Sequence, residues 1–261
     1  HLDFYMFKYN CNNMENNKLG AGILQISTEE RAINYRWEKD ADKLDKNISI
    51  VCMDDIQNLV NDGWTFKTKM PIREGMTLAL HPFISKCYID INIAEDELFK
   101  DKFNCLGRVV KLLGAKSFEA KAVFLEAKTR IIDATGKINY KLIKADASYK
   151  KSEEEKYAKT YSRKEIFLGE FTRQGYEKAK QLIKQYKLEE DLNYIVEQRN
   201  PDDGNTFSEQ NIAVDLSEEL NRLTECAFSL NVLKGVFTLN ANVKQTISTQ
   251  KKIIVETKII F

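Results

Sequence analysis

The sequence predicts an α+β fold built mainly on antiparallel sheet, and two patterns carry this prediction. Apolar residues recur at helical spacing from Leu98 to Leu113, and Gly114 follows as a typical helix terminator. Alternating apolar and polar residues then run through residues 118–124 and 138–142, with the turn Asp-Ala-Thr-Gly between them. Strands joined by so short a turn pair antiparallel, so the order is helix, strand, turn, strand.

The composition is that of an ordinary globular protein that folds by itself. Of 261 residues, 43% are hydrophobic and 30% are charged. At this length, one large domain and two domains are equally compatible with the chain. A formal net charge of +1 argues against a surface built to grip nucleic acid.

Cysteine usage and hydropathy favour a cytoplasmic protein. The five cysteines are scattered and never arranged as CxxC, which indicates reduced thiols and not a disulfide framework. Only two histidines accompany them, so we expect neither a structural zinc site nor a cofactor. The chain contains no run of eighteen apolar residues and does not begin like a signal peptide, so we expect neither a membrane span nor secretion.

Residues 1–94 are predicted to form a mixed α/β portion. Asp54 is the expected N-cap of a helix whose Ile56 and Leu59 share a face and which ends at Gly63. The expected strands are rich in β-branched and aromatic residues and occupy residues 22–27, 48–53, 63–70 and 76–83.

The helix and hairpin described first form an αββ unit over residues 95–148, and a polar insert follows over residues 149–207. Apolar residues recur every three or four positions between residues 172 and 188, which predicts an amphipathic helix there. Lysines and tyrosines of this insert are compatible with binding to nucleic acid or anionic lipid. Acidic residues are interspersed among them, however, and this favours a solvated helix face.

Residues 208–261 are predicted to repeat the αββ order, which would make the fold a duplication. A helical pattern begins at Leu216 and leads into an alternating strand that contains Phe237, Leu239, Ala241 and Val243. The polar sequence Ser-Thr-Gln-Lys-Lys then forms the expected turn into a last strand. Little literal identity links the two units, so the duplication rests on element order alone.

The triplet Glu126-Ala127-Lys128 is the best catalytic candidate. In nucleases of the PD-(D/E)xK type, the Glu binds a divalent cation and the Lys orients the attacking water, while an Asp on a neighbouring strand completes the site. Asp90 is the nearest suitable acid, but a whole helix separates the two strands in sequence. A cross-strand charge pair at the rim of the strand is the simpler interpretation.

A second catalytic hypothesis concerns His81, the only internal histidine, with Cys87 close by in sequence. His81 directly precedes Pro82 at an expected strand end. A hydrogen-bonded structural role is commoner at such a position.

Two amphipathic hairpins, one in each expected αββ unit, raise the hypothesis of membrane perforation. A strand crosses a bilayer with roughly nine to eleven residues, and the expected strands are long enough. This plan is similar to that of soluble pore-forming proteins such as the gasdermins, although no gasdermin motif is matched residue by residue. The membrane-facing residues would be Phe237, Leu239, Ala241 and Val243.

We therefore expect a cytoplasmic binding or interaction protein that is not an enzyme. Its expected partner is another protein or a small anionic ligand, and membrane contact would require a conformational change. The alternatives are a membrane-perforating effector and a metal-dependent nuclease that uses Glu126, Lys128 and Asp90. The sequence makes no prediction about the oligomeric state.

Overall fold

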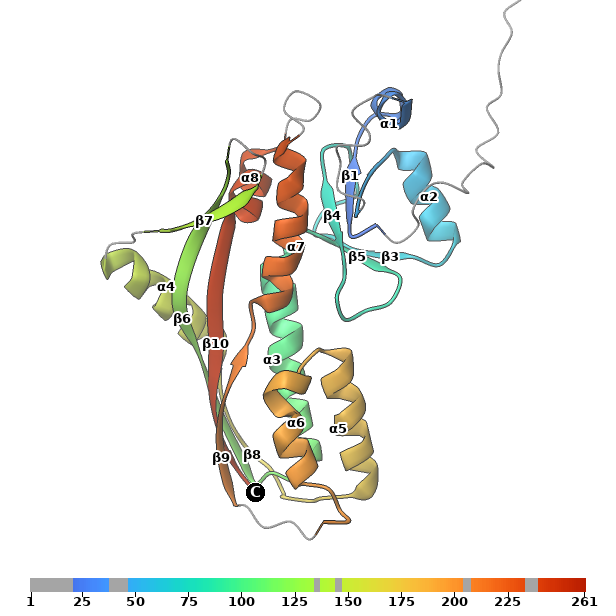
Figure 1. Ribbon diagram of the computed structural model, residues 1–261. Helices are drawn as coiled ribbons and strands as arrows, with labels where there is room; N and C mark the ends of the chain where they lie inside the picture. The colour runs from blue at the N-terminus through green and yellow to red at the C-terminus, as the bar shows by residue number, and fades with distance from the viewer. Residues whose placement is uncertain (1–20, 38–46, 134–136, 144–146, 204–207, 233–238) are drawn as a thin grey trace, which may run out of the picture.

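The computed structural model describes residues 21–37, 47–133, 137–143, 147–203, 208–232 and 239–261. Over these residues it contains eight helices and ten strands in two mostly antiparallel sheets, which confirms the predicted α+β class. Figure 1 shows a small sheet beside a tall, curved sheet, with helices along one side of the tall sheet. We call these the N-terminal sheet and the long sheet.

The N-terminal sheet has the strand order β2-β1-β4-β5-β3. Its outer pairs, β1 with β2 and β3 with β5, are parallel, whereas β4 pairs antiparallel with both β1 and β5. Four of the five strands fall within the segments predicted from β propensity, and β5 lies outside them. Their bounds are β1 (Ile23–Ile26), β2 (Ile48–Val51), β3 (Thr65–Lys67), β4 (Thr77–Leu80) and β5 (Cys87–Asp90).

Two helices accompany this sheet, α1 (Glu29–Trp37) and α2 (Met53–Asn61). The N-cap of α2 is Cys52, two residues before the predicted Asp54. The Asp55 carboxylate accepts hydrogen bonds from the backbone N–H of Cys52 (2.9 Å) and from its thiol (3.3 Å). The helix therefore starts earlier than predicted, because a reciprocal capping box forms around a thiol.

The long helix α3 (Ala94–Leu112) lies between the two sheets in the chain and ends as the sequence predicts. Gly114 has φ +80, a left-handed conformation that glycine adopts without strain. A Cβ at this position would also lie 2.7 Å from the Cβ of Phe171. Glycine is thus required here both by the backbone conformation and by close packing.

The long sheet is organised around one strand that has neighbours on both edges. β6 (Ser117–Ile132) pairs antiparallel through residues 117–129 with β10 (Thr249–Ile260), with a shift of register between Lys252 and Ile253. β9 (Glu209–Asp215) lies on the far side of β10. The last two strands share the remaining edge of β6, where β7 (Ile138–Leu142) pairs with residues 128–132 and β8 (Ser162–Ile166) with residues 117–121.

The helix α4 (Ala147–Thr160) connects β7 to β8, so it interrupts what would otherwise be a single edge strand. The remaining helices pack on the side of the long sheet that faces α3 or lie at its upper end (Figure 1). Their bounds are α5 (Arg173–Gln185), α6 (Glu189–Gln198), α7 (Glu218–Phe228), the short 3-10 helix Ser229–Val232 and α8 (Ala241–Ser248).

The predicted second αββ unit is wrong, because a helix occupies part of its expected first strand. Ala241 and Val243 lie on α8, Leu239 lies just before this helix, and Phe237 falls outside the described residues. The side chain of Asn240 accepts a hydrogen bond from the Val243 N–H (2.8 Å) and caps the helix. Val243 and Ile247 lie four residues apart and are both buried, so they share one face of a helix. The segment therefore forms a helix although its apolar residues also fit the alternation of a strand.

One core joins the two sheets. The largest cluster of buried apolar residues contains Ile23 and Ile89 from the N-terminal sheet, Phe99 from α3, and Phe118 and Val255 from the long sheet. A second, smaller cluster packs between the opposite face of the N-terminal sheet and α2. The predicted boundary near residue 94 is therefore crossed by a continuous apolar core.

Candidate functional site

The three residues of the nuclease hypothesis lie in two different sheets. Glu126 and Lys128 are half-exposed on β6 and form an ion pair with each other, with 2.6 Å between Oε1 and Nζ. Asp90 ends β5 in the N-terminal sheet, where its Oδ1 accepts hydrogen bonds from the backbone and side-chain amides of Asn92 (2.9 and 2.8 Å). Among the described residues, no group of three or more His, Cys, Asp and Glu side chains is arranged to hold a metal ion.

A polar pocket of about 420 Å³ opens beside Glu126 and Lys128 and extends to α7. Arg222 lines it and forms an ion pair with Glu218 (2.5 Å). Asp215 also lines it, and its Oδ1 accepts hydrogen bonds from the N–H and hydroxyl of Ser217 (both 2.7 Å). The charged side chains named here are therefore paired with groups of the protein itself and are not free to bind a small ion. The pocket carries no surplus charge of one sign.

Three of the four residues of the perforation hypothesis lie in the described part of the chain, on a helix or buried, whereas Phe237 falls outside it. Leu239 and Val243 are buried in the main core, and Ala241 begins α8. Among the residues that the structure describes, no helix is both long and apolar enough to cross a bilayer. The hairpin expected from β6 and β7 is present, but the main partner of β6 is β10.

His81 is buried against α3 and not beside a thiol. Its Nδ1 accepts a hydrogen bond from the Phe83 N–H (3.2 Å), and its Nε2 lies 3.6 Å from Oδ2 of Asp101. Burial lowers the pKa of His81 to about 4, with Lys67 lowering it further and Asp101 opposing. His81 donates its backbone N–H to the Cys87 carbonyl (2.8 Å), whereas the Cys87 thiol contacts the Tyr88 carbonyl.

The cysteines show no disulfide in the described part of the chain. Cys52, Cys87 and Cys105 are free thiols, and Cys11 falls outside the described residues. Burial raises the pKa of Cys105 to about 12, which makes this thiol a poor nucleophile near neutral pH.

A buried ion pair that sequence reasoning missed joins α3 to α7. Lys102 and Glu219, whose side chains are 1% and 2% exposed, place Nζ and Oε2 3.0 Å apart. Nζ of Lys102 also donates to the Asp215 carbonyl (2.7 Å). The available signal was the position of Lys102 on the apolar face of α3, next to Phe99 and Phe103.

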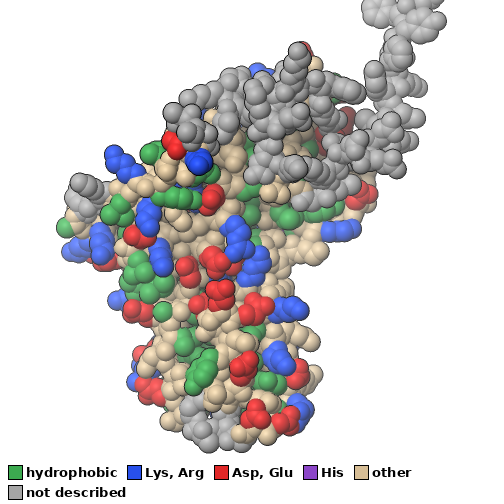
Figure 2. All heavy atoms as spheres, in the orientation of Figure 1, with side chains coloured by type: hydrophobic (Ala, Val, Ile, Leu, Met, Phe, Trp, Pro, Cys, Tyr) green, Lys and Arg blue, Asp and Glu red, His purple; other side chains and the backbone are tan. Residues whose placement is uncertain are grey.

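Further acids surround this pair at the start of α6 and α7. Figure 2 shows Asp and Glu side chains gathered near the middle of the visible face, around the region where these helices meet. Burial raises the pKa of the Asp191 carboxyl to about 6, with Lys102 opposing and Asp215 adding to the effect.

A second buried polar network, also missed, attaches α4 to the sheet. Tyr157 donates its hydroxyl to Oε1 of Glu95 (2.6 Å) and accepts a hydrogen bond from Nζ of Lys251 (2.9 Å). Lys251 lies 3.2 Å from a carboxylate oxygen of both Glu95 and Glu153. Although burial opposes it, these carboxylates raise the pKa of Lys251, so the ammonium stays charged.

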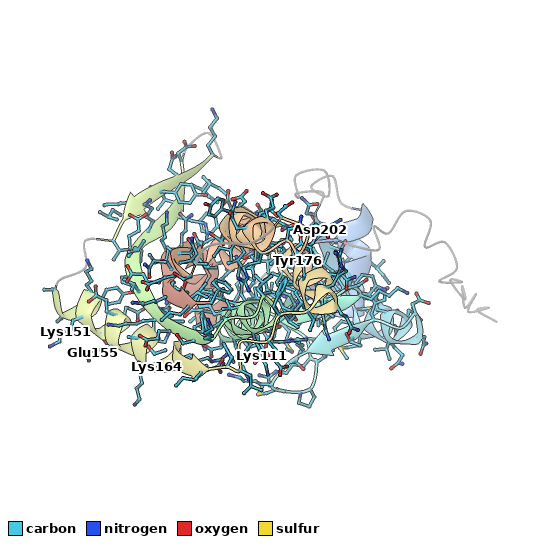
Figure 3. The ribbon with its side chains drawn as sticks, turned by 90° about the horizontal axis from the view of Figure 1, so that it is seen from below. Lys111, Lys151, Glu155, Lys164, Tyr176 and Asp202 are labelled. Atoms are coloured by element: carbon cyan, nitrogen blue, oxygen red, sulfur yellow. The ribbon has the colours of Figure 1, made fainter. Side chains whose placement is uncertain are left out.

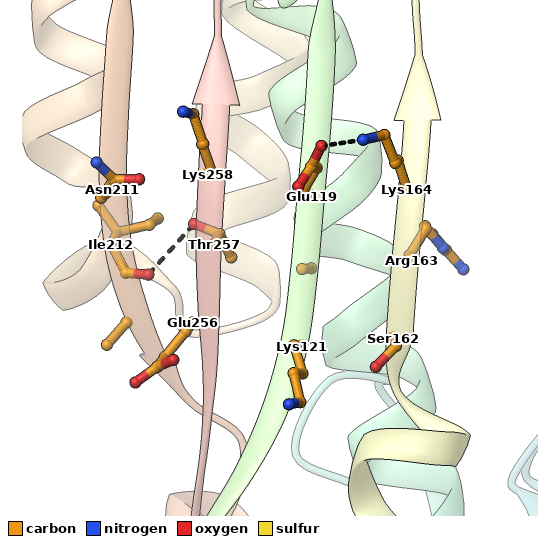
Figure 4. A pocket seen from close by; sticks show the side chains of 12 residues that line it. Glu119, Lys121, Ser162, Arg163, Lys164, Asn211, Ile212, Glu256, Thr257 and Lys258 are labelled. Carbon is orange, nitrogen blue, oxygen red and sulfur yellow. Dashed lines mark hydrogen bonds and ion pairs between the residues drawn. The ribbon is translucent and has the colours of Figure 1, made fainter.

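An open surface is formed by the face of the long sheet that points away from α3, which we call the outer face. Its cross-strand rows alternate in charge: Lys164, Glu119 and Lys258 lie side by side on β8, β6 and β10. In the next row, Lys121 lies opposite Glu256. Figure 4 shows these side chains lining a shallow depression of about 830 Å³.

The charges of the outer face are largely neutralised within the sheet. Lys164 forms an ion pair with Glu119 (2.5 Å), and Lys258 forms one with Glu209 (3.1 Å). Alternation of sign between neighbouring strands stabilises a sheet and leaves no single-sign surface for a phosphate backbone.

At the lower end of the outer face, the exposed side chains are apolar and no longer charged. Ile166 is 82% exposed and Leu168 is 89% exposed, and both belong to β8 or to the residues just after it. Ile260 on β10 is also exposed, and both Ile166 and Ile260 lie opposite Ser117 in the sheet. A single exposed apolar residue is ordinary on a protein surface, but two of them two positions apart, one on β8 and one just after it, are not expected of a surface that contacts water alone.

The strand β8 has one paired edge and one open edge. Phe167 N–H donates to the Lys116 carbonyl (2.8 Å), and the Tyr161 carbonyl accepts from the Ala122 N–H (3.0 Å), so odd-numbered residues direct their backbone groups at β6. Even-numbered residues direct theirs outward. We call Ser162, Lys164, Ile166 and Leu168 the β8 edge.

The β8 edge is accessible from both faces. Ser162, Arg163 and Lys164 line the depression on the outer face, and Ser162 and Arg163 also line a pocket of about 600 Å³ against α3. In the described part of the chain, no other strand pairs with this edge. Viewed from below, Lys164 projects at the border of the molecule, on the same side as Lys151 and Glu155 of α4 and away from Tyr176 (Figure 3).

The β8 edge was not among the predicted site residues. The sequence signal was the segment Glu-Ile-Phe-Leu, in which Ile166 and Leu168 flank Phe167. Phe167 packs on the core, so Ile166 and Leu168, which directly precede and follow it, are expected to point to the opposite face. Comparison of the chain with protein-family models, with curated proteins and with solved structures finds no match.

Proposed function

We propose that the chain is a cytoplasmic interaction protein without catalytic activity, which binds another protein through the β8 edge. The observation that carries this proposal is the exposure of Ile166 and Leu168, at 82% and 89%, beside an unpaired strand edge. Large apolar side chains and open backbone groups are together the features by which an extended partner segment adds to a sheet.

A protein partner fits this region better than a small anion. The nearest cation on the outer face, Lys164, already pairs with Glu119. Apolar area contributes roughly 25 cal/mol per Å² when a partner covers it, and burial of Ile166 and Leu168 would supply that gain. Binding of this kind needs no bound cofactor.

Site-specific photo-crosslinking in cells tests the proposal. A photoreactive amino acid replaces Leu168 in one variant and Leu142 in a control, because Leu142 is also exposed but lies on β7. We expect a discrete protein adduct from position 168 only. Equal labelling from both positions, or none from position 168, would contradict the proposal.

The variant Ile166→Asp provides a second readout. Ile166 is mostly exposed, so this change should leave the thermal unfolding temperature unaltered, because surface substitutions have small effects on stability. We expect the adduct from position 168 to disappear. Persistence of the adduct in a folded Ile166→Asp variant would show that the partner does not use the β8 edge.

A further inference from the structure

We infer that the partner at the β8 edge is a second copy of this chain, paired strand to strand about a twofold axis. The inference rests on the proposed function and adds the identity of the partner. In the dimer, β8 of one copy would run antiparallel to β8 of the other and join the two long sheets into one.

The backbone of β8 sets which registers are allowed. Ser162, Lys164 and Ile166 direct their N–H and C=O groups away from β6, so only these residues can form the hydrogen-bonded pairs of a new ladder. A twofold axis at Lys164 satisfies this condition, because Lys164 then faces its own copy and Ser162 faces Ile166 of the other.

Charge selects this register among those allowed. With the axis at Lys164, Arg163 of each copy faces Glu165 of the other, twice in the dimer. Within one copy, Nε of Arg163 already lies 3.5 Å from Oε1 of Glu165, and its Nη2 donates to Oδ1 of Asn104 (2.6 Å), so the dimer adds a second carboxylate to each arginine. An axis at Arg163 would place two arginines opposite each other, and an axis at Glu165 would place two glutamates opposite each other. Arg163 and Glu165 form the non-hydrogen-bonded pair, in which opposite side chains approach most closely.

The central lysines do not prevent this pairing. Charged residues, lysine above all, usually protect an edge strand from self-association. Lys164, however, already has the carboxylate of Glu119 at 2.5 Å on the outer face of its own copy. Each copy therefore presents a neutralised lysine at the axis.

Ile166 lies close to the axis in this register. It faces Ser162 of the other copy in a hydrogen-bonded pair, so one flank of this exposed apolar side chain gains a neighbour.

A charge-swap mixing experiment tests the inference by sedimentation velocity. Arg163→Glu makes a copy with two acids on this face of β8, and Glu165→Arg makes a copy with two bases. Each variant alone should dimerise about tenfold more weakly than wild type, because two attractive cross-strand pairs become repulsive. An equimolar mixture should form a heterodimer of wild-type strength, since every acid then faces a base.

Two proline variants separate this edge from the other open edge of the long sheet. Lys164→Pro deletes an N–H that points away from β6, and Asn211→Pro deletes one that points away from β10 on β9. Circular dichroism confirms folding of both. We expect only Lys164→Pro to abolish the dimer, and loss of the dimer in Asn211→Pro alone would overturn the inference.

A wild-type chain that sediments as a monomer at every concentration would also overturn the inference. The proposed function would survive that result if position 168 still crosslinked to a different protein. Failure of the mixture to dimerise better than its components, with both variants folded, would exclude the Lys164 register and with it the inference.

Discussion

Lys102 illustrates how far a single residue can depart from what local sequence suggests. A lysine on a helix is normally a solvated charge, yet Lys102 is one of the largest fully buried side chains described. It is held there by Glu219, 117 residues away, and by the Asp215 carbonyl. Removing one partner would leave the other charge buried without compensation.

We therefore expect Lys102→Ala to lower the free energy of unfolding by about 3–5 kcal/mol, the usual cost of breaking a buried pair. The double variant Lys102→Met, Glu219→Leu should recover most of this loss, because neither charge remains. Urea denaturation measures both. Lys100→Met, an exposed neighbour on α3, is the matched control and should change little.

His81 gives a second prediction at this scale. Its pKa in the folded chain is about 4, below the ordinary 6.5, so the folded state favours the neutral ring. The corresponding stability is complete above pH 6.5 and is lost as the pH falls toward 4, by about 3 kcal/mol in total.

Denaturation of wild type and His81→Gln across this pH range checks the prediction. The difference in unfolding free energy between the two chains should change with pH in the stated direction. A constant difference would mean that His81 keeps its ordinary pKa when folded.

At the scale of elements, α4 depends on polar contacts because its apolar face is small. Tyr157 is its one buried residue, and the hydroxyl of Tyr157 bridges Glu95 and Lys251. A helix with so little apolar burial owes its position to this network and to the stacking of Tyr157 on Phe124.

We expect Lys251→Met to loosen α4 selectively, because Glu95 and Glu153 would then share a buried site without their cation. Hydrogen exchange of residues 147–160 should accelerate about tenfold or more, corresponding to a loss of 1.4 kcal/mol, while α5 stays protected. Lys151→Met, on the exposed side of α4, is the control. Uniform acceleration across the chain would indicate general destabilisation instead.

The elements themselves were predictable where one local pattern dominated. α3, its glycine terminator and the hairpin of β6 with β7 follow from uninterrupted periodicity. The strand expected at residues 237–243 was predicted from the alternation of Leu239, Ala241 and Val243. The prediction was wrong because Asn240 caps a helix at this point and Ile247 repeats the buried position of Val243 one helical turn later. Where a sequence fits both periods, the secondary structure that forms is the one whose apolar side chains become buried in the core.

At the scale of the whole molecule, the shared core predicts that both sheets unfold together. Both tryptophans, Trp37 and Trp64, lie in the N-terminal portion, and Trp64 stacks on Tyr88 (5.1 Å). Their fluorescence therefore reports on the N-terminal sheet alone. Phe118 lies in the long sheet and belongs to the common core.

We expect Phe118→Ala to lower the stability reported by tryptophan fluorescence by about 3–5 kcal/mol, equal to the loss measured by circular dichroism. Two transitions, with fluorescence unaffected by the substitution, would instead establish a domain boundary near residue 94.

Sequence alone determined the α+β class, most of the N-terminal strands, α3 and the hairpin that follows it, because these depend on residues close together in the chain. Only the tertiary structure decided that Asp90 and Glu126 lie in separate sheets, that Lys102 meets Glu219, and that β8 borders the long sheet with an open edge. Such facts depend on which distant segments pack together, and no local period encodes that choice.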